Sequence, residues 1–399
     1  MSDFEQVVAT SPRCAWIGDT LAWLEPDDIS ISYSASRGEV TRHTAGRAEV
    51  VGDDPFAVLE RELAEGPEDA RWYGYFGYAS RSDLPASPDP HQPDAVWMRP
   101  SHRESLVVAH RNAVLGGPQL TIRGTRTADS AYVEAFGRVQ EELHAGNSYE
   151  VNLTHRVEVE SELDPATAYL RLSELNPAPY AGFLQHDVPG ARAWLLSSSP
   201  ERYALITADR TIETKPIKGT TPRGTTPEED EAARVHLATD PKFRSENLMI
   251  VDLLRNDLAT VCEVGTVTVP GLMQVESYAA VHQLVSTVRG RLRPEVSTVH
   301  ALRNLFPAGS MTGAPKLRTM QIIDAVEATP RGTYAGAFGW IGADGRADLG
   351  VVIRSLTTSN DGRYRLGTGG GITVASDAAE EWAETQWKAE RLLRALSSR

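Results

Sequence analysis

Cysteine is nearly absent from this chain, since Cys14 and Cys262 are the only two in 399 residues. So few cysteines exclude a disulfide-stapled scaffold and a zinc or iron–sulfur site built on thiolates, and they favour a reducing compartment. The chain also has no run of 18 apolar residues, and its first residues lack the basic and then apolar segments typical of a signal peptide. We therefore expect a cytoplasmic protein that does not enter a membrane.

Positive charge is in deficit as well. The chain has 40 Lys and Arg against 54 Asp and Glu, a formal net charge of −14, which excludes a nucleic-acid binder held mainly by a basic surface. Hydrophobic residues make up 41% and charged residues 24%, which is ordinary for a globular protein with a substantial core. Length and composition alone leave open whether the chain forms one large domain or two.

The hydrophobic pattern predicts an α+β fold with antiparallel sheets, because strands and helices come in clusters and not in strict βαβ alternation. Residues 1–125 have short apolar runs between clusters of Pro, Asp and Gly, which predicts strands with short helices. Further helices are expected at 128–146, after Thr226, after Asp240 and from about Ser376, and strands at 149–159, 193–212, 266–269, 280–291, 336–341, 350–356 and 364–366.

Carboxylates on two of the expected helices can be interpreted in two ways. Glu246 lies on the helix that opens at Asp240, whereas Glu381 and Glu384 share a face of the last helix, with Lys388 four residues further on. They form either a solvated face with an ion pair or, if the helices meet, an oxygen-only site for a hard divalent cation such as Mg²⁺. The residues alone do not choose between these interpretations.

Lys218 stands out in the run 212–224, IETKPIKGTTPRG, where Pro216 keeps the preceding residue extended. A free lysine has a pKa of about 10.4, so a nucleophilic lysine near pH 7 needs its pKa lowered by roughly three units. Burial or a neighbouring cation such as Lys215 would lower it. The alternative is an ordinary exposed lysine in a turn.

Four other features could serve binding. The glycine-rich stretch 367–376, GTGGGITVAS, precedes a helix and is either a flexible turn or a backbone cradle for an anion, and 309–316, GSMTGAPK, is a similar loop that enters a helix at a proline. His282 lies in an apolar strand, where a core histidine with satisfied hydrogen bonds is the commoner explanation. Arg354 lies in a strand that looks buried, so it needs a carboxylate partner from the protein or from a ligand.

Several motifs together resemble those of the chorismate-utilising enzymes, in the order of that family and over about residues 130–395. They are SSSPERY (197–203), KPIKGT (215–220), ENLMIVDLLRNDL (246–258), VHQLVSTVRGRL (281–292), FPAGSMTGAPKLRTMQIIDAVE (306–327), YAGAFGWIG (334–342), IRSL (353–356) and GTGGGITVASD (367–377). The resemblance implies one domain, 1–399, with two large antiparallel β-sheets packed roughly orthogonally and helices outside. Residues 1–125 would complete the sandwich, and residues 126–399 would carry all the motifs.

Within the family, the branches differ at the third residue of the P-I-x-G-T motif, and at this position the chain resembles one branch more than the others. Lys218 is typical of members that make 4-amino-4-deoxychorismate on the route to p-aminobenzoate and folate, whereas anthranilate synthases carry Ala there. Phe243 replaces a glutamate that other branches carry, and Glu150 replaces the water-activating lysine of isochorismate synthases, where glutamine is more usual in amine-transferring members. Whether Glu150 orients substrate or merely replaces a glutamine stays open.

The resemblance also implies roles for single residues. Lys218 would attack the ring of chorismate and Glu201 would act as the general acid. Mg²⁺ would be bound by Glu246 and Glu384, with Glu381 nearby through water. The remaining substrate contacts would come from Gly219, Thr220, His282, Thr312, Tyr334, Arg354, Gly369, Gly370 and Gly371, with Tyr334 and Arg354 holding the enolpyruvyl carboxylate.

The resemblance further implies partners outside this chain. Cys14 and Cys262 lack the flanking glycines of a nucleophile elbow, so ammonia is expected from a separate glutamine amidotransferase subunit. Related large subunits hold tryptophan in an N-terminal pocket, for which Leu21–Pro26 is the candidate here, with an edge strand as the alternative. The alternative functions are anthranilate synthase component I, which Lys218 disfavours, and a catalytically silent scaffold, which the complete residue set disfavours.

Overall fold

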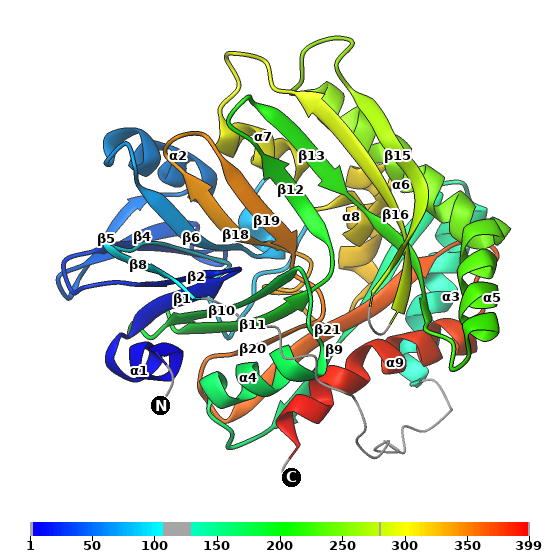
Figure 1. Ribbon diagram of the computed structural model, residues 1–399, viewed down its shortest axis with the longest axis horizontal. Helices are drawn as coiled ribbons and strands as arrows, with labels where there is room; N and C mark the ends of the chain where they lie inside the picture. The colour runs from blue at the N-terminus through cyan, green and yellow to red at the C-terminus, as the bar shows by residue number, and fades with distance from the viewer. Residues whose placement is uncertain (1–2, 107–128, 279–280, 398–399) are drawn as a thin grey trace.

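The computed structural model describes residues 3–106, 129–278 and 281–397, and within them the chain forms two large antiparallel sheets with helices outside (Figure 1). The nine-stranded sheet has the order β17 (Gly313–Ala314), β9 (Glu150–Glu160), β21 (Arg363–Ile372), β20 (Ser355–Thr358), β11 (Ala193–Ser199), β10 (Tyr180–His186), β1 (Arg13–Ile17), β2 (Thr20–Trp23) and β8 (His102–Ser105).

The other sheet has twelve strands among the described residues. Its order is β14 (Ile217–Pro222), β16 (Val281–Arg291), β13 (Thr211–Lys215), β12 (Arg202–Ile206), β19 (Ala347–Val351), β18 (Ala337–Gly342), β6 (Arg71–Phe76), β7 (Ala95–Arg99), β3 (Ile29–Ser34), β4 (Glu39–Thr44) and β5 (Arg47–Gly52), and β15 (Thr268–Ser277) pairs with β16. The predicted α+β class with antiparallel sheets is confirmed.

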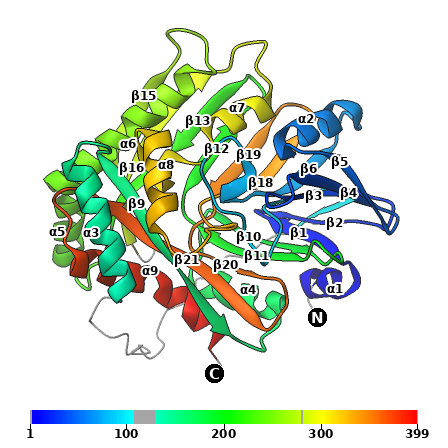
Figure 2. The same ribbon diagram turned by 180° about the vertical axis from the view of Figure 1, so that it is seen from behind.

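Helices cover the outer faces of the two sheets (Figures 1 and 2). Their bounds are α1 (Asp3–Thr10), α2 (Pro55–Glu65), α3 (Ser130–His144), α4 (Pro165–Leu175), α5 (Pro227–Thr239), α6 (Pro241–Ala259), α7 (Thr298–Leu305), α8 (Lys316–Val326) and α9 (Ala378–Leu396). Across the described ranges, none of these helices is long and apolar enough to cross a bilayer.

The side-chain alternation of single strands explains how the layers pack. On β6, Tyr73 and Tyr75 point toward the nine-stranded sheet and join the core between the sheets, whereas Trp72 and Phe76 point the other way. That second core packs against α2, α6 and α7, and a third core joins the nine-stranded sheet to α1, α4 and α9. Because successive strand residues face opposite sides, each sheet is buried on both faces and strands such as β11 are continuously apolar or small.

Strands from the first part of the chain enter both sheets. β1 pairs with β10 in the nine-stranded sheet, and β6 pairs with β18 in the twelve-stranded sheet. The boundary expected near residue 125 lies outside the described residues. The segment Leu21–Pro26 forms most of β2 and its exit, and β2 lies between β1 and β8 and not at the sheet edge. Tryptophan binding at this segment stays a prediction.

Helix starts follow from local sequence chemistry. Thr226 and Glu229 form the predicted capping box of α5, and Asp240 caps α6, each followed by a proline in the first helical turn. Three predictions need correction. Residues 193–212 are divided among β11, β12 and the start of β13, and residues 350–356 are divided between β19 and β20 by a bend. The glycines 367–371 belong to β21 and not to a loop before the last helix.

A buried polar network joins the two sheets where β1 and β10 of the nine-stranded sheet pack against β3 and β4 of the twelve-stranded sheet. The Arg13 guanidinium of β1 donates to Ser30 Oγ of β3 (3.2 Å), and Ser30 Oγ lies 2.9 Å from His186 Nε2 of β10. His186 Nδ1 is 2.7 Å from the carbonyl oxygen of Ala191, so in its neutral form it donates there and accepts from Ser30. His43 of β4 pairs in the same way with Ser32 (2.8 Å).

This network predicts a loss of stability in acid. Burial, with Arg13 nearby, lowers the pKa of His43 to about 4, and burial lowers the pKa of His186 to about 3. The unfolded chain binds these protons at a pKa of about 6.5, so stability is complete above that pH and falls as the pH drops toward 4, by about 3 kcal/mol for His43.

Urea unfolding followed by circular dichroism at pH 7.5 and pH 4.5 measures this loss. We expect His43→Gln to be less stable than the wild type at pH 7.5 but to lose less stability between the two pH values, because the titrating group is gone. Carboxylates contribute equally to both proteins and cancel in the difference. An equal loss in both proteins would contradict the assignment.

Candidate functional site

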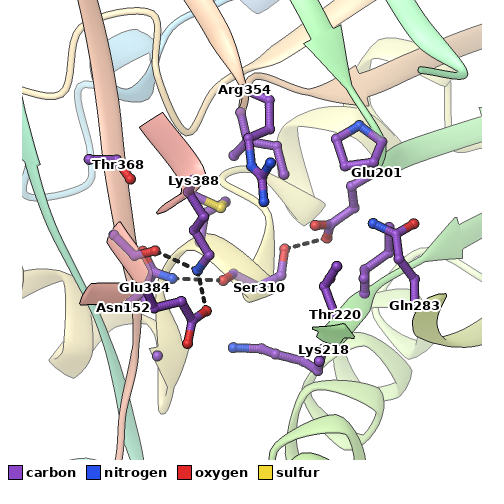
Figure 3. A pocket seen from close by; sticks show the side chains of 18 of the residues that line it. Asn152, Glu201, Lys218, Thr220, Gln283, Ser310, Arg354, Thr368, Glu384 and Lys388 are labelled. Carbon is purple, nitrogen blue, oxygen red and sulfur yellow. Dashed lines mark hydrogen bonds and ion pairs between the residues drawn. The ribbon is translucent and has the colours of Figure 1, made fainter. Parts of the chain in front are cut away.

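One cavity of about 420 Å³ gathers most of the predicted site residues (Figure 3). Its walls come from β14 and β16 of the twelve-stranded sheet, β21 of the nine-stranded sheet, and the helices α6 and α9. In Figure 3, Arg354 and Lys388 enter from one side and Lys218 from the opposite side. The predicted residues that line it are Glu201, Lys218, Gly219, Thr220, Glu246, Tyr334, Arg354, Gly369, Gly370, Gly371, Glu381 and Glu384.

Two predicted substrate contacts, His282 and Thr312, are not among the residues that line this cavity. His282 points to the other face of β16, where its ring nitrogens lie 2.7 Å from Ser277 Oγ and 3.0 Å from Asp230 Oδ1. Its neighbour Gln283 faces the cavity instead, as strand alternation requires. Thr312 is fully buried and its hydroxyl donates to backbone carbonyls of its own loop.

A backbone irregularity aims Lys218 into the cavity. The pairing of β14 with β16 shifts register between Ile217 and Thr220, which is the effect of a β-bulge. Gly219 within this segment has φ of +88°, a conformation that side chains rarely adopt, and a Cβ there would lie 2.9 Å from Leu237 and 3.0 Å from Phe243. The glycine therefore lets the strand turn Lys218 inward beneath α5 and α6.

The surroundings of Lys218 are anionic and not cationic. Its Nζ donates to Glu150 Oε1 at the start of β9, and the Lys218 residue is 8% exposed. Burial lowers the pKa of Lys218, but Glu150, Glu246 and Glu201 more than offset this effect, so the pKa lies above its usual value. The expected lowering by Lys215 is therefore wrong, because Lys215 pairs with Glu276 at 2.6 Å.

Glu201 presents a carboxyl group poised near neutrality. It lies in the turn between β11 and β12, is 4% exposed, and accepts a hydrogen bond of 2.6 Å from Ser310 Oγ. Burial raises the pKa of Glu201 to about 7, against the opposing effects of Ser310 and Lys218. A carboxyl group with this pKa can both donate and accept a proton at neutral pH.

The predicted carboxylates of two helices do meet, and two lysines interleave with them. On α9, Glu381 accepts from Lys242 of α6 (3.1 Å) and Glu384 pairs with Lys388 (2.7 Å). Burial raises the pKa of Glu246 on α6 to about 7, although Lys218 acts against it. The interpretation of these carboxylates as a merely solvated face is therefore wrong for Glu246 and Glu381, which are 8% and 3% exposed.

The donor set of these carboxylates fits an oxygen-preferring cation. Glu246 Oε1 is buried and has no hydrogen-bond partner among the described residues, which calls for a ligand or an ion. Within the described ranges, no three acidic, histidine or cysteine side chains already form a metal cluster, and Glu381 and Glu384 are held by lysines. A divalent cation here would exchange those ion pairs for bonds to Glu246 and its neighbours on α9.

The glycines of β21 let the strand pass very close to these side chains. A Cβ on Gly371 would lie 2.1 Å from Glu150 Oε1 and 2.9 Å from Lys218 Nζ. Lys388 Nζ donates to the Gly369 carbonyl (2.8 Å), so this edge of β21 points away from β9 and toward the cavity. Because alternate residues of a strand direct their backbone groups to the same edge, the N–H groups of Gly369 and Gly371 face the same way.

Arg354 and Tyr334 are held on strained backbone. Arg354 has φ of +50° and Ala335, next to Tyr334, has φ of +65°, both in the left-handed region that non-glycine residues rarely occupy. Burial, together with Arg391, lowers the pKa of Arg354 to about 10, and its guanidinium lies 5.2 Å from the ring centre of Trp387. Among the described residues, no carboxylate forms an ion pair with Arg354, so it is free to bind an anion.

Sequence reasoning missed several residues that line the cavity. Lys242 could have been found, because it lies four residues before Glu246 on the same helical face. Trp387 directly precedes Lys388, but nothing in the spacing indicated its stacking on Arg354. Others include Asn152, Gln283, Ser310, Met311 and Thr368, which only the tertiary structure brings to the cavity.

Comparison with known families supplies the identification. A family model described as chorismate binding enzyme matches residues 23–394, almost the whole chain. The chain belongs to the chorismate-binding enzymes. This assignment explains why the motifs of the cavity occur together and why both sheets contribute to it.

Relatives and solved structures of chorismate-binding enzymes agree with this assignment. The chain is 53% identical over 93% of its length to aminodeoxychorismate synthase of Streptomyces pristinaespiralis and 44% identical over 66% to aminodeoxychorismate synthase component 1 of Escherichia coli. It spans 51% and 57% of those two proteins. Anthranilate synthase component I of Streptococcus pneumoniae has a similar structure, with a TM-score of 0.75, 25% identity, and coverage of 96% of this chain and 93% of that one.

Because β21 passes so close to Glu150 and Lys218, we predict that one methyl group added at Gly371 weakens chorismate binding. Gly371→Ala would push Glu150 and Lys218 apart, so we expect chorismate affinity, measured by titration calorimetry, to fall at least tenfold (about 1.4 kcal/mol) while the circular dichroism spectrum is kept. Gly137→Ala on the exposed face of α3 is the matched control, because a Cβ there meets nothing within 4 Å. Equal affinity of Gly371→Ala and the wild type would refute the role of this glycine.

Proposed function

We propose that the chain acts as aminodeoxychorismate synthase component I, which converts chorismate and ammonia into 4-amino-4-deoxychorismate. The observation that carries this proposal is the amine of Lys218 inside the cavity, with Glu201 on the adjoining wall. The names of the two aminodeoxychorismate synthase relatives support it.

The charge layout supports binding of a dianionic substrate by an acidic protein. Chorismate carries two carboxylates, and Arg354 together with Tyr334 offers a site for one of them. The backbone N–H groups of Gly369 and Gly371 offer donors for the other. Local cations and backbone dipoles thus decide binding, and not the net charge of −14.

The proposed chemistry uses two displacements in place of one. Lys218 attacks C2 of the ring while the 4-hydroxyl group leaves as water with the proton of Glu201. Ammonia then attacks C4 and expels Lys218, so the enolpyruvyl group is retained. The pKa of Glu201, raised by burial to about 7, suits this donor role because the carboxyl group is still partly protonated at neutral pH.

We propose Mg²⁺ as the cofactor, held by Glu246 and Glu384 with Glu381 nearby. The unpartnered Oε1 of Glu246 and the oxygen-only donor set support this choice over a softer metal. When bound, Mg²⁺ would neutralise a substrate carboxylate next to these glutamates. Lys242 and Lys388 hold Glu381 and Glu384 in place without it.

The second candidate function is anthranilate synthase component I. The similar structure from Streptococcus pneumoniae carries that name, as does a relative from Haloarcula marismortui that is 41% identical over 67% of this chain. Lys218 favours the first function, because a covalent lysine intermediate explains how the nitrogen reaches C4 with no loss of pyruvate. Ammonia is proposed to come from a separate glutamine amidotransferase subunit.

Product analysis tests the proposed reaction. With chorismate, Mg²⁺ and ammonium, we expect mass spectrometry to show 4-amino-4-deoxychorismate, and glutamine to replace ammonium only after an amidotransferase subunit is added. Lys218→Ala should lower the rate at least a thousandfold, because it removes the nucleophile, whereas Lys215→Ala on the same segment should be near normal. The fluorescence of o-aminobenzoate as the direct product would instead establish anthranilate synthase.

Metal titration tests the carboxylate assignment. Glu246→Gln removes the unpartnered carboxylate oxygen, so we expect the Mg²⁺ concentration for half-maximal activity to rise at least tenfold. Mn²⁺ binding followed by electron paramagnetic resonance should weaken in parallel. Glu380→Gln, on an exposed position of the first turn of α9, is the control. Unchanged Mn²⁺ affinity in Glu246→Gln would exclude this residue as a ligand.

A further inference from the structure

Lys218, which lines the cavity, makes a buried contact with a residue of the other sheet. Lys218 comes from β14 of the twelve-stranded sheet and Glu150 from β9 of the nine-stranded sheet, and Lys218 Nζ donates to Glu150 Oε1. Glu150 is 1% exposed, and within the part of the chain that the structure describes its Oε2 has no hydrogen-bond partner. Gly371 covers the pair so closely that a Cβ there would overlap Glu150 Oε1. The pair is therefore shielded from bulk water.

This contact poses a chemical problem for a lysine nucleophile. An ammonium group has no lone pair, so Lys218 must lose a proton before it can form a bond. The charged groups that act most strongly on it are Glu150 of β9, Glu246 of α6 and Glu201 before β12, and Glu384 of α9 also lies near. These carboxylates stabilise the protonated amine and outweigh the cations that line the same cavity, which are Lys242, Lys388 and Arg354. Of the carboxylates, only Glu150 forms a hydrogen bond with Lys218 in the described structure.

We propose that Glu150 is the proton partner of Lys218, taking the ammonium proton as Nζ bonds to the ring and returning it when that bond breaks. The inference rests on the proposed role of Lys218 as nucleophile and extends it to a residue without an assigned function. Oε1 already receives the donated hydrogen, and the free Oε2 leaves room for the protonated carboxyl group to keep one acceptor oxygen.

Protons and charges balance over the two displacements. In the first, one proton passes from Lys218 to Glu150, the amine bonds to C2, the two conjugated double bonds shift, and the C4 hydroxyl group leaves as water with the Glu201 proton. In the second, ammonia bonds to C4, the double bonds shift back, and the C2–N bond breaks. Lys218 then recovers its proton from Glu150, and the new C4 ammonium group gives one proton to Glu201. Both carboxyl groups return to their starting states.

The proposal makes a prediction about pH that a purely structural role does not make. A lysine and a glutamate that share one proton keep the same proton count in the ammonium–carboxylate and amine–carboxylic acid forms. The fraction in the reactive amine form is then independent of pH between the two titrations of the pair. A lysine opposite glutamine must instead release its proton to solvent, so its reactive fraction falls tenfold for each pH unit below its pKa.

Adduct formation measures this difference. Full-length enzyme with Mg²⁺ and chorismate, without ammonium, is quenched in acid at times after mixing. The covalent Lys218 adduct is quantified by intact-mass spectrometry from pH 5 to pH 7, where Glu201, whose pKa burial raises to about 7, still holds the proton that it donates. Over this range we expect wild-type rates to change less than threefold, and Glu150→Gln rates to fall tenfold for each unit by which the pH is lowered. Glu150→Asp, which keeps a carboxylate, should be slower but retain the flat acid side.

A direct titration of Lys218 supplies a readout that does not depend on turnover. In ¹⁵N-lysine-labelled protein, with Lys218→Arg to assign the signal, Nζ of Lys218 should titrate at lower pH in Glu150→Gln than in the wild type. In the wild type, a rate of adduct formation that stays constant as the pH rises toward neutrality indicates that the proton of Lys218 passes to Glu150 and not to solvent. Rates that rise tenfold per unit would show that the proton goes to solvent and would overturn the proposal.

The outcomes separate the two hypotheses. If Glu150→Gln forms the adduct at the wild-type rate with the same flat acid side, Glu150 only fills space and Lys218 keeps its role. If the wild type forms no adduct while product still appears with ammonium, the nucleophile of the proposed function is wrong, and the role of Glu150 falls with it.

Discussion

The contact between Lys218 and Glu150 is the constraint on which the site depends. It joins β14 to β9, so each sheet supplies one member and the cavity exists only where the two sheets meet. Removing two charges from water is costly unless the geometry is fixed, and here the bulge at Gly219 and the bare backbone at Gly371 fix it. A small shift of either strand would leave an unpaired charge in a buried place, which costs several kcal/mol.

Pairing of buried opposite charges also organises the rest of the cavity. Carboxylates and cations alternate around the cavity, with Lys242 against Glu381 and Lys388 against Glu384, so opposite charges largely compensate one another despite the many ionisable groups. Among the residues that the structure describes, no cation forms an ion pair with Glu201 or Glu246, and burial raises the pKa of each to about 7. These two groups can therefore gain or lose a proton near neutral pH, whereas the pairs Lys242–Glu381 and Lys388–Glu384 serve as fixed charges.

Local rules of the sequence predicted what local interactions determine. The starts of α5 and α6 follow from Thr226 and Asp240 with their prolines. The presence of Glu246 and the α9 carboxylates at one cavity was implied by the family resemblance and not by a local rule. Properties set by tertiary contacts were missed or wrong. The glycine run forms a strand because β9 pairs with it. Gln283 and not His282 faces the cavity, because a single apolar run does not show which side chains of a strand point to which face. The carboxylates near Lys218 come from segments that are distant in the sequence. Each error concerns which groups lie across a sheet or a helix interface.

The positions of the groups that donate and accept protons, more than the fold, distinguish the reactions that this architecture can support. A structure that is 25% identical and carries the name anthranilate synthase superposes with a TM-score of 0.75, so the two sheets do not by themselves select a product. Water, ammonia and a lysine amine differ in the proton each must lose when it attacks the ring. In the proposed reaction, Glu150 and Lys218 exchange that proton through their hydrogen bond, and Glu201 supplies one to the departing hydroxyl group. A few side chains on a shared frame can therefore redirect the same substrate, because each alters only where a proton is held before the bond forms.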